Sequence, residues 1–400
     1  MAGFTYIILL FCLCSTFAKD CLINNVPEQM AFEKQLRKDL KCGYQVFDPP
    51  FGNQTTSEVS VRFIMKRFSF NSDEEIFSVQ TWMFISWIDK RLKWDPDKYY
   101  GTTETELSSM SIWTPGFRLF NSADSNDFDR YYFVSCRVKN TGLVSCVPKI
   151  THEALCSVKL TNWPYDQQEC SLEFGPWSTK WSKFVMTFNS RAISMLGAEY
   201  GAEWFISDYR QEANYSSERQ LKMFFTLERE GSGLAAIVVY PAIILTALSI
   251  TCLFLDVRQN VRLAMISFSL YGHYYFLREV MDNLPKHSLD SPNLLFYYRG
   301  SLILTLIIVL VTFLLDAICK LKVTPQNYFL TINDSVYGSF GKYLIFPQWN
   351  LDEDAIKNKQ FSNDWTKFAN IINCAFNVII IVTYIILYCV LMPKPIPVSY

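Results

Sequence analysis

The sequence predicts an all-β extracellular sandwich followed by an α-helical four-span transmembrane bundle. Three observations lead to this fold class: an apolar leader, alternating strand patterns with several cysteines up to about residue 230, and long uncharged stretches beyond it. The overall composition is ordinary, with 400 residues, 50% hydrophobic residues and a net charge of −1. The prediction therefore comes from how the residues are distributed along the chain.

Residues 1–18 have the pattern of a secretory signal peptide. An apolar run over residues 6–14 is followed by Thr16, Phe17 and Ala18, which ends on a small residue before Lys19. The run is too short to cross a bilayer, which disfavours a membrane anchor. We therefore expect the residues from 19 onward to enter an oxidising compartment, where disulfides persist.

The chain has 12 cysteines, two of which leave with the signal peptide. Local spacing favours the disulfides Cys156–Cys170 and Cys136–Cys146, because the second pair is symmetric about an Asn-Thr-Gly turn of hairpin type. Cys21–Cys42 is then the remaining pair. A disulfide that closes so short a loop is worth roughly 3 kcal/mol, so a purely structural role would explain it. Cysteines in or beside apolar segments are predicted to be buried free thiols: Cys252, Cys319, Cys374 and Cys389.

Residues 19–232 form the predicted extracellular domain, and strand patterns dominate them. Apolar residues alternate along two segments: Val59, Val61, Phe63 and Met65, and Phe77, Val79, Met83, Ile85 and Trp87. Trp82 falls on the opposite face of its strand, which suits a partner surface, although single exposed aromatic residues are common. Short strands separated by turns predict a disulfide-tied β-sandwich. Asn53 and Asn214 begin glycosylation sequons.

Residues 233–315 are predicted to hold the first three transmembrane helices and residues 368–392 the fourth. Uncharged stretches cover residues 234–255, 300–315 and 368–392, with lengths that suit a bilayer core. Residues 263–277 are uncharged but shorter and more polar, which predicts a helix shielded from lipid, with a re-entrant or interfacial segment as the alternative. Residues 316–367 then form a lysine-rich cytoplasmic loop and residues 393–400 an extracellular tail, in agreement with the positive-inside tendency.

In combination, these segments resemble one family, the pentameric Cys-loop neurotransmitter-gated ion channels. CSVKLTNWPYDQQEC (residues 156–170) resembles the signature loop, and WMFISWIDKRLKWDPDKY (residues 82–99) resembles the second-strand motif of nicotinic acetylcholine receptors. IWTPGFRLFNSAD (residues 112–124) resembles the first ligand-binding loop, and CSLEFGPW (residues 170–177) leads into the second. Pro241 and Pro285 match prolines of the first span and of the end of the pore helix. The resemblance indicates a divergent, nicotinic-like subunit of invertebrate type.

The resemblance implies that the signature loop lies at the membrane end of the β-domain and passes its movement to the pore. Two aromatic side chains would pack on the connections between spans, and a carboxylate would pair with a cation there. The residues in these positions are Trp163, Pro164, Tyr165 and Asp166.

The resemblance also implies a ligand site between neighbouring subunits. Its aromatic positions are Phe120, Trp177 and Tyr215 on one subunit and Trp82 on the next. Such rings attract cations, which implies a cationic amine as transmitter, whereas each ring alone could be ordinary packing. The sequence departs from the nicotinic pattern at Gly116, where Asp is usual, and at Ser216 and Ser217, which replace adjacent cysteines. These departures disfavour acetylcholine and favour an accompanying subunit.

The two prolines set a register that implies a pore-lining stripe at helical spacing. Its residues are Ala264, Phe268, Tyr271, Tyr275, Arg278 or Glu279, and Asp282. The rings would narrow the pore, and apolar constrictions gate by dewetting. Val261 stands at the selectivity position beside Arg262, so the inner mouth is expected to favour anions and the outer mouth cations. The outer-domain motifs tip the expectation weakly towards cations.

Three functions compete. The leading hypothesis is a subunit of a pentameric ligand-gated ion channel, multi-pass in the plasma membrane and postsynaptic. Its expected partners are a small-molecule transmitter, other subunits of the same family in a homo- or hetero-pentamer, and membrane lipid, but no nucleic acid. The alternative is a non-conducting accessory or assembly subunit, which the bulky pore stripe favours. An enzyme is disfavoured because the three histidines show no triad or zinc spacing, so no catalytic residue, metal or cofactor is expected.

Overall fold

The computed structural model describes residues 28–50, 57–124, 134–176, 184–199, 201–214, 220–286, 288–321, 323, 325–338 and 363–395. Several predictions fall outside these residues, namely those for the signal peptide, Cys21, Asn53, Trp177, Tyr215 and most of the cytoplasmic loop. They stay predictions.

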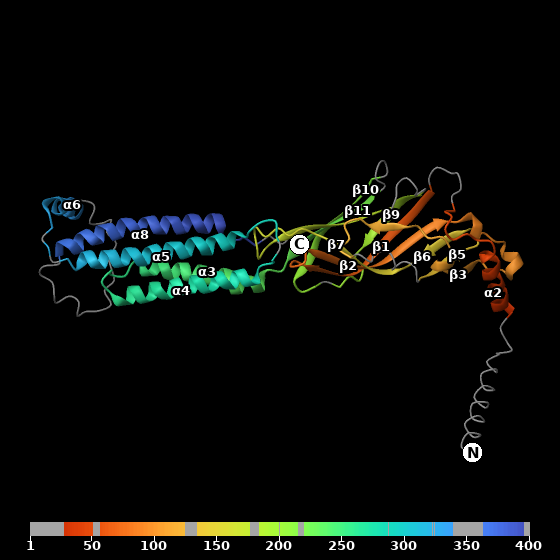
Figure 1. Ribbon diagram of the computed structural model, residues 1–400, viewed down its shortest axis with the longest axis horizontal. Coiled ribbons are helices and arrows are strands. Elements are labelled where there is room, and N and C mark those ends of the chain that lie inside the picture. The colour runs from red at the N-terminus through yellow and green to blue at the C-terminus, as the bar shows by residue number, and fades with distance from the viewer. Residues whose placement is uncertain are drawn as a thin grey trace, which may run out of the picture.

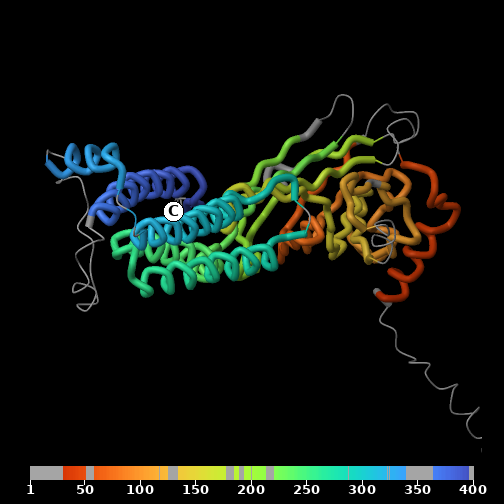
Figure 2. Tube along the Cα trace, turned by 60° about the vertical axis from the view of Figure 1, so that its left-hand side comes forward, coloured from red at the N-terminus to blue at the C-terminus, as the bar shows by residue number. Residues whose placement is uncertain are grey.

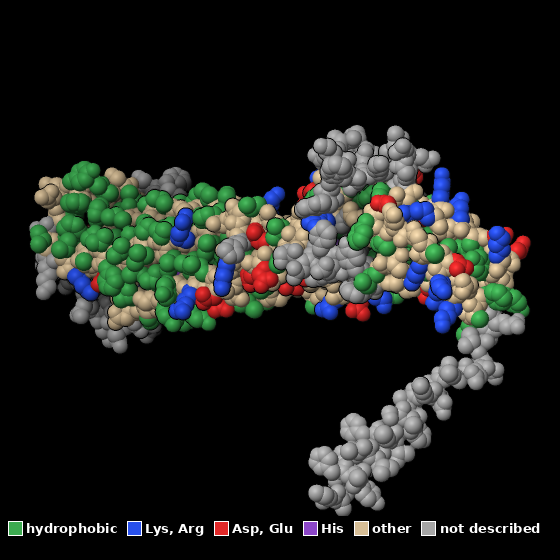
Figure 3. Space-filling view, turned by 45° about the vertical axis from the view of Figure 1, so that its right-hand side comes forward, with side chains coloured by type: hydrophobic (Ala, Val, Ile, Leu, Met, Phe, Trp, Pro, Cys, Tyr) green, Lys and Arg blue, Asp and Glu red, His purple; other side chains and the backbone are tan. Residues whose placement is uncertain are grey.

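The molecule is elongated, with a β-rich half and a helical half joined end to end (Figures 1 and 2). The strands of the first half come from residues before 230, and the long helices come from residues after it. Figure 3 shows that apolar side chains cover most of the visible surface of the helical half, whereas charged side chains are scattered over the β-rich half. The chain therefore has the two-part architecture, a β-domain followed by a helical bundle, that its sequence predicts.

Two sheets form the β-domain. The larger has the strand order β3 (Glu104–Ser108), β5 (Ser135–Lys139), β6 (Leu143–Cys146), β2 (Ile76–Ile88), β1 (Ser57–Asn71) and β9 (Phe184–Ser194), with β7 (Lys149–Leu155) also paired to β2. The smaller has the order β10 (Trp204–Asn214), β11 (Gln220–Arg229), β8 (Gln167–Pro176) and β4 (Phe117–Leu119). Helix α2 (Glu28–Lys41) lies at the distal end, and three short 3₁₀ helices, η1 (Lys90–Leu92), η2 (Pro96–Tyr99) and η3 (Ser109–Ser111), lie in connections.

The predicted alternation places the core between the sheets. All nine apolar residues singled out along β1 and β2 are buried, because successive side chains of a strand point to opposite faces. The two sheets meet through aromatic rings: Phe63 lies 5.1 Å from Phe174 between ring centres, and Phe77 lies 5.5 Å from Phe225. These contacts make the domain a packed sandwich.

Two disulfides form among the described residues of the β-domain. Cys136 and Cys146 are direct cross-strand partners in the hairpin of β5 and β6, which turns through Gly142 at a φ of +85°, a value that favours glycine. Cys156 and Cys170 close the loop between β7 and β8. Cys42 is exposed just after α2, and its predicted partner lies outside the described residues.

Four long helices form the second half: α3 (Ser232–Cys252), α4 (Asn260–Asn283), α5 (Asn293–Cys319) and α8 (Asn363–Leu391). The short helix α6 (Asn327–Gly338) packs on the start of α8. Three of the long helices, all except α4, are long and apolar enough to cross a membrane. Helix α4 packs against both α3 and α5, which fits the expectation of a polar helix supported by its neighbours.

The predicted burial of the membrane cysteines is only partly right. Cys252 and Cys319 are buried, but Cys374 is half-buried and Cys389 is exposed. Both of the latter lie on α8, the candidate span with the smallest buried share, 17%. The prediction equated an apolar segment with the protein interior, whereas α8 also exposes apolar residues such as Ile379, Ile385 and Val390.

Candidate functional site

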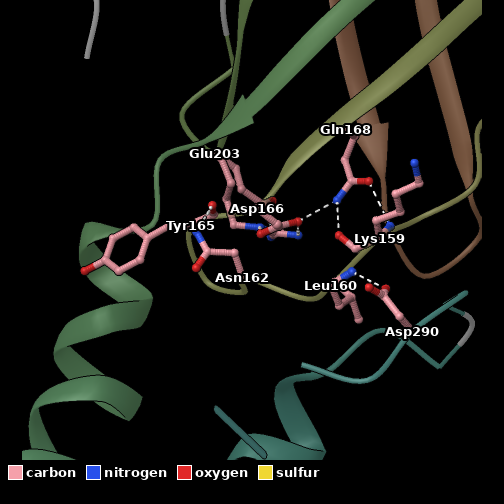
Figure 4. Close-up of polar contacts among 9 residues, drawn as sticks. Lys159, Leu160, Asn162, Tyr165, Asp166, Gln168, Glu203 and Asp290 are labelled. Atoms are coloured by element: carbon pink, nitrogen blue, oxygen red, sulfur yellow. Dashed lines mark hydrogen bonds and ion pairs between the residues drawn. The ribbon is translucent and has the colours of Figure 1, made fainter. Parts of the chain in front are cut away.

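The loop 156–170 lies where the two halves of the molecule meet (Figure 4). Asp290, in the connection between α4 and α5, accepts a hydrogen bond from the backbone N–H of Leu160 at 2.7 Å and another from the Thr161 hydroxyl. The same connection donates backbone N–H groups to the loop, from Leu289 to Val158 at 3.1 Å and from Asn293 to Thr161 at 3.1 Å. The loop is thus hydrogen-bonded directly to the helix connection.

A buried ion pair anchors the other side of the loop. Arg229, the last residue of β11 before α3, donates from Nε to Asp166 Oδ1 at 2.8 Å, and both side chains are almost completely buried. Arg229 also pairs with Glu203, and its guanidinium stacks 4.2 Å from the centre of the Trp204 ring. Gln168 donates to Asp166 Oδ2 at 2.7 Å. The Asp166 carboxylate is thus paired with a cation, but Arg229 supplies it from the end of β11 and not from a connection between spans, where the resemblance implied it.

The tip of the loop packs closely on the start of α3. Trp163 is buried, and Tyr165 is half-buried beside Gly231. A Cβ at position 231 would lie 2.3 Å from the carbonyl oxygen of Pro164, so only glycine fits there. Next to this contact, Trp163 and Arg229 line a cavity of about 360 Å³ between the β-domain and the helices. The junction between the β-domain and the helices is thus closely packed at Gly231 and leaves a cavity beside Trp163.

The end of the last helix also reaches the loop. The Asn162 side chain accepts the backbone N–H of Lys394 at 3.1 Å and donates to its carbonyl at 2.9 Å. Helix α8 therefore ends beside the β-domain, at the opposite end of the bundle from α6 (Figure 1).

Trp82 is the residue that the neighbouring subunit would contribute to the predicted ligand box, and it is one of the described residues. It is 39% exposed on the outward face of β2, as its strand pattern predicts. Two lysines flank its ring: the Nζ of Lys66 from β1 and the Nζ of Lys149 from β7 each lie 4.9 Å from the ring centre. Sequence reasoning missed this pair of lysines.

Of the three box residues predicted on the first subunit, Phe120 is the one that the structure describes. It follows β4 and is exposed, and its backbone N–H donates to the carbonyl of Glu173 on β8 at 2.7 Å. Its ring lies directly on Gly175, where an added Cβ would be 2.2 Å from the ring. Phe120 is thereby held at the edge of the smaller sheet.

The exposed side of α4 follows the predicted stripe. Its exposed members are Ala264, Phe268, Tyr271, Tyr275, Arg278 and Asp282. Of the two alternatives at the outer end, Arg278 is exposed and forms an ion pair with Asp282 at 3.7 Å, whereas Glu279 is half-buried and accepts from Asn283. The opposite side of α4 is buried against the other helices, while Phe268, Tyr271 and Tyr275 on the stripe stay exposed.

Arg262 does not add positive charge to the inner mouth, so that expectation is wrong. The side chain is fully buried, and it donates to the carbonyl of Leu255 at 2.9 Å and to Asn373 Oδ1 on α8 at 3.0 Å. One residue along an α-helix turns the side chain by about 100°, so a neighbour of exposed Val261 points into the bundle. Arg258 is paired with Asp256 at 2.7 Å.

Polar side chains join three helices inside the bundle. The Ser249 hydroxyl of α3 lies 2.7 Å from that of Ser269 on α4, and Nε2 of His273 on α4 lies 2.7 Å from the Ser301 hydroxyl on α5. The sequence indicated polar residues on α4 but not their partners. Asp290 and Arg229 were missed too, although a charge just before the first apolar span was a usable signal for Arg229.

Comparisons with known proteins agree on one family. A family model described as the neurotransmitter-gated ion-channel ligand binding domain matches residues 33–231, up to the start of α3. The acetylcholine receptor subunit beta-like 1 of Drosophila melanogaster is 24% identical over 70% of this chain and 56% of its own length. The acetylcholine receptor subunit beta-type lev-1 of Caenorhabditis elegans is 24% identical over 72% and 57%. The neuronal acetylcholine receptor subunit beta-2 of Carassius auratus is 25% identical over 66% and 57%. The chain thus spans about half the length of the curated relatives it matches.

Proposed function

Because the chain belongs to the Cys-loop family of neurotransmitter-gated ion channels, we propose that it is one subunit of a pentameric channel opened by an extracellular small molecule. The observation that carries the proposal is the junction described above. There the loop 156–170 is hydrogen-bonded to the connection that follows α4, while buried Asp166 holds Arg229 at the start of α3. A shift of the strands would therefore act on the start of α3 and on the connection between α4 and α5.

The proposed topology follows from the helix order. The signal peptide (1–18) is removed and residues 19–232 form the extracellular domain. The bundle lies in the plasma membrane as a multi-pass domain, with residues 316–367 in the cytoplasm and 393–400 outside. The contact of Lys394 with Asn162 supports the outer placement of the tail, because Asn162 belongs to the β-domain. Other subunits of the family, in a homo- or hetero-pentamer, and membrane lipid complete the assembly, which we place at the postsynaptic membrane.

The proposed permeant ion is a cation. Arg262 is buried in the bundle and Arg258 is paired with Asp256, so neither offers an unpaired charge to the inner mouth. At the outer end of the exposed stripe, Asp282 and the half-buried Glu279 outnumber Arg278. Rings of charged side chains set the sign of the ion that passes, so this end favours cations.

Two-electrode voltage clamp of cells that express the full chain tests the proposal, alone and together with nicotinic-type subunits. The cells are screened with cationic amines and amino-acid transmitters, and surface labelling confirms delivery. We expect a ligand-evoked current whose reversal potential follows the cation gradients. Asp290→Ala should abolish most of this current at unchanged surface level, because Leu160 and Thr161 lose their acceptor.

The matched control is Asp97→Asn in η2, an exposed carboxylate at the distal end of the β-domain. A full current in Asp290→Ala would contradict the coupling role of the junction. Surface protein without current, alone and with every partner, would contradict the channel and establish the second candidate.

That second candidate is a non-conducting accessory or assembly subunit. Four large rings are exposed along the face of α4 that would line the pore: Phe268, Tyr271, Tyr274 and Tyr275. Five copies of such rings would leave an apolar constriction that excludes water. Tyr271→Leu separates the two candidates, because a current that appears only in this variant shows an assembled pore closed by its own side chains.

A further inference from the structure

We propose that the outward face of β1, β2 and β7 binds the carboxylate of a small anionic ligand, with Trp82 as its platform and Lys66 and Lys149 as its charges. This inference rests on the proposed function, because it names the chemical class of the ligand at the site between subunits. It replaces the cationic amine that the aromatic box alone suggested.

The two lysines reach the ring from opposite sides of β2. Strand β2 lies between β1 and β7, and Lys149 is the direct cross-strand partner of Trp82 on β7. Lys66 comes from β1, two residues beyond Ile64, the cross-strand partner of Trp82 on that side. Each ammonium group lies 4.9 Å from the same ring centre, within the range in which a cation is attracted to an indole.

A bulge in β1 lies beside Lys66 on this face. The pairing with β2 runs from Met65–Thr81 to Arg67–Gln80, so Lys66 is the extra residue and has no cross-strand partner. Met65 and Phe68 remain buried on either side of it, while Lys66 and Arg67 both stay outside the core. Bulges commonly re-aim side chains next to functional sites. Lys66 is outward by regular alternation, because Met65 before it is buried, and the bulge leaves the exposed Arg67 outside the core as well.

Among the described residues, no carboxylate neutralises the charge of this pair. In the part of the chain that the structure describes, neither lysine forms an ion pair. The exposed Glu199 donates its backbone N–H to the carbonyl of Lys66, but its carboxylate pairs with neither ammonium. Glu153 is opposite Ser78, four residues along β2 from Trp82 and thus roughly 13 Å away. Exposed Arg62, opposite Phe84, adds a further positive charge to the same face.

This arrangement selects against a cationic ligand and favours an anionic one. A quaternary ammonium that approached the Trp82 ring would meet two like charges that already occupy the attractive region around it. A carboxylate is attracted by both ammonium groups, and the short carbon chain attached to it can rest on the indole. Small amino-acid carboxylates have this combination.

Lysine acylation on intact cells that express the full chain tests the inference, with mass spectrometry as the readout. The probes are glutamate and acetylcholine. Glutamate is expected to slow acylation of Lys66 and Lys149 several-fold and to leave exposed Lys98, in η2, unchanged. Acetylcholine should protect none of them. Protection by acetylcholine, or equal behaviour of all three lysines with glutamate, would overturn the inference.

Matched variants sharpen the result. Lys66→Gln should raise the glutamate concentration that half-protects Lys149 by about tenfold, the loss expected for one charged hydrogen bond, whereas Lys66→Arg and Lys98→Gln should change it little. The double variant Lys66→Gln with Lys149→Gln removes both ammonium groups from the Trp82 ring and should therefore gain acetylcholine-evoked responses. An unchanged half-protecting concentration in Lys66→Gln would contradict the inference.

The failures of the two proposals are distinguishable, because acylation requires no ion flow. Glutamate protection without any current contradicts the channel but supports the anion site. A current evoked by acetylcholine, without glutamate protection, supports the channel and contradicts the anion site.

Discussion

Replacement of Asp166 by alanine should destabilise the chain by about 3 kcal/mol. The side chains of Asp166 and Arg229 are 1% and 4% exposed, so the substitution leaves a guanidinium buried without its main carboxylate. Removal of one partner of a buried pair costs about 3–5 kcal/mol. The lower end applies here, because Glu203 still pairs with Arg229 from a position that is 57% exposed.

Loss of the hydrogen bond from Gln168 to Asp166 adds little to this destabilisation. Gln168 donates from Nε2 both to Asp166 Oδ2 at 2.7 Å and to the carbonyl of Lys159 at 2.8 Å, so the amide keeps one acceptor in the variant. A change of 3 kcal/mol corresponds to a drop in Tm of roughly 6–12 °C for a domain of 150–250 residues.

The assay heats the full chain in detergent and measures the fraction that remains monodisperse by size-exclusion chromatography. Glu203→Ala is the matched control and should lower Tm by at most about 2–4 °C, since an exposed partner contributes at most about 1 kcal/mol. Asp166→Ala with Arg229→Met should be more stable than Asp166→Ala alone, because no buried charge is left. Equal shifts for Asp166→Ala and Glu203→Ala, or strictly additive effects in the double variant, would refute the reasoning.

Three further predictions concern the ligand face, the inner mouth and the distal end. Gly175→Val should raise the agonist concentration for half-maximal current by at least about tenfold at unchanged surface level, because a Cβ there would lie 2.2 Å from the Phe120 ring and must displace it. Arg262→Met should leave the reversal potential unchanged because the guanidinium is buried, whereas Val261→Lys on the exposed side should move it away from the cation equilibrium potentials; a shift in the first variant would contradict the assigned orientation. Burial and the hydrogen bond to Asp89 raise the pKa of Tyr44 above its usual value of 10.0, so its stabilising contribution is complete below that pH and is lost as pH rises towards the folded pKa. Tyr44→Phe should therefore flatten the alkaline fall of Tm, and an unchanged pH profile would count against this account.

Much of the fold could be predicted because its signals are local. Alternation along β2 is enough to place Phe77 and Met83 in the core and Trp82 outside it, and helical spacing is enough to place Phe268 and Tyr271 on one side of α4. These patterns depend only on how far apart residues are along one element.

The rest depended on contacts that no local pattern encodes. Asp290 and Leu160 are 130 residues apart in sequence, and their hydrogen bond forms only when the β-domain packs against the helical bundle. The approach of Lys66 to Trp82 depends on the register of β1 against β2, which the pattern along one strand does not reveal. The buried orientation of Arg262 likewise requires Asn373 from a helix more than a hundred residues away.

The tie between Asn162 and Lys394 makes the signature loop sensitive to the thickness of the membrane. Helix α8 has 29 residues and is therefore roughly 43 Å long, more than the roughly 30 Å of a bilayer core. A helix longer than the lipid around it responds by tilting, and the tilt changes when the bilayer swells or thins. Because Lys394, just beyond the end of α8 at Leu391, forms two hydrogen bonds to Asn162, we expect such a change of tilt to move the loop. Sterol-rich and sterol-poor membranes should thus set different resting positions for the contact between Asn162 and Lys394.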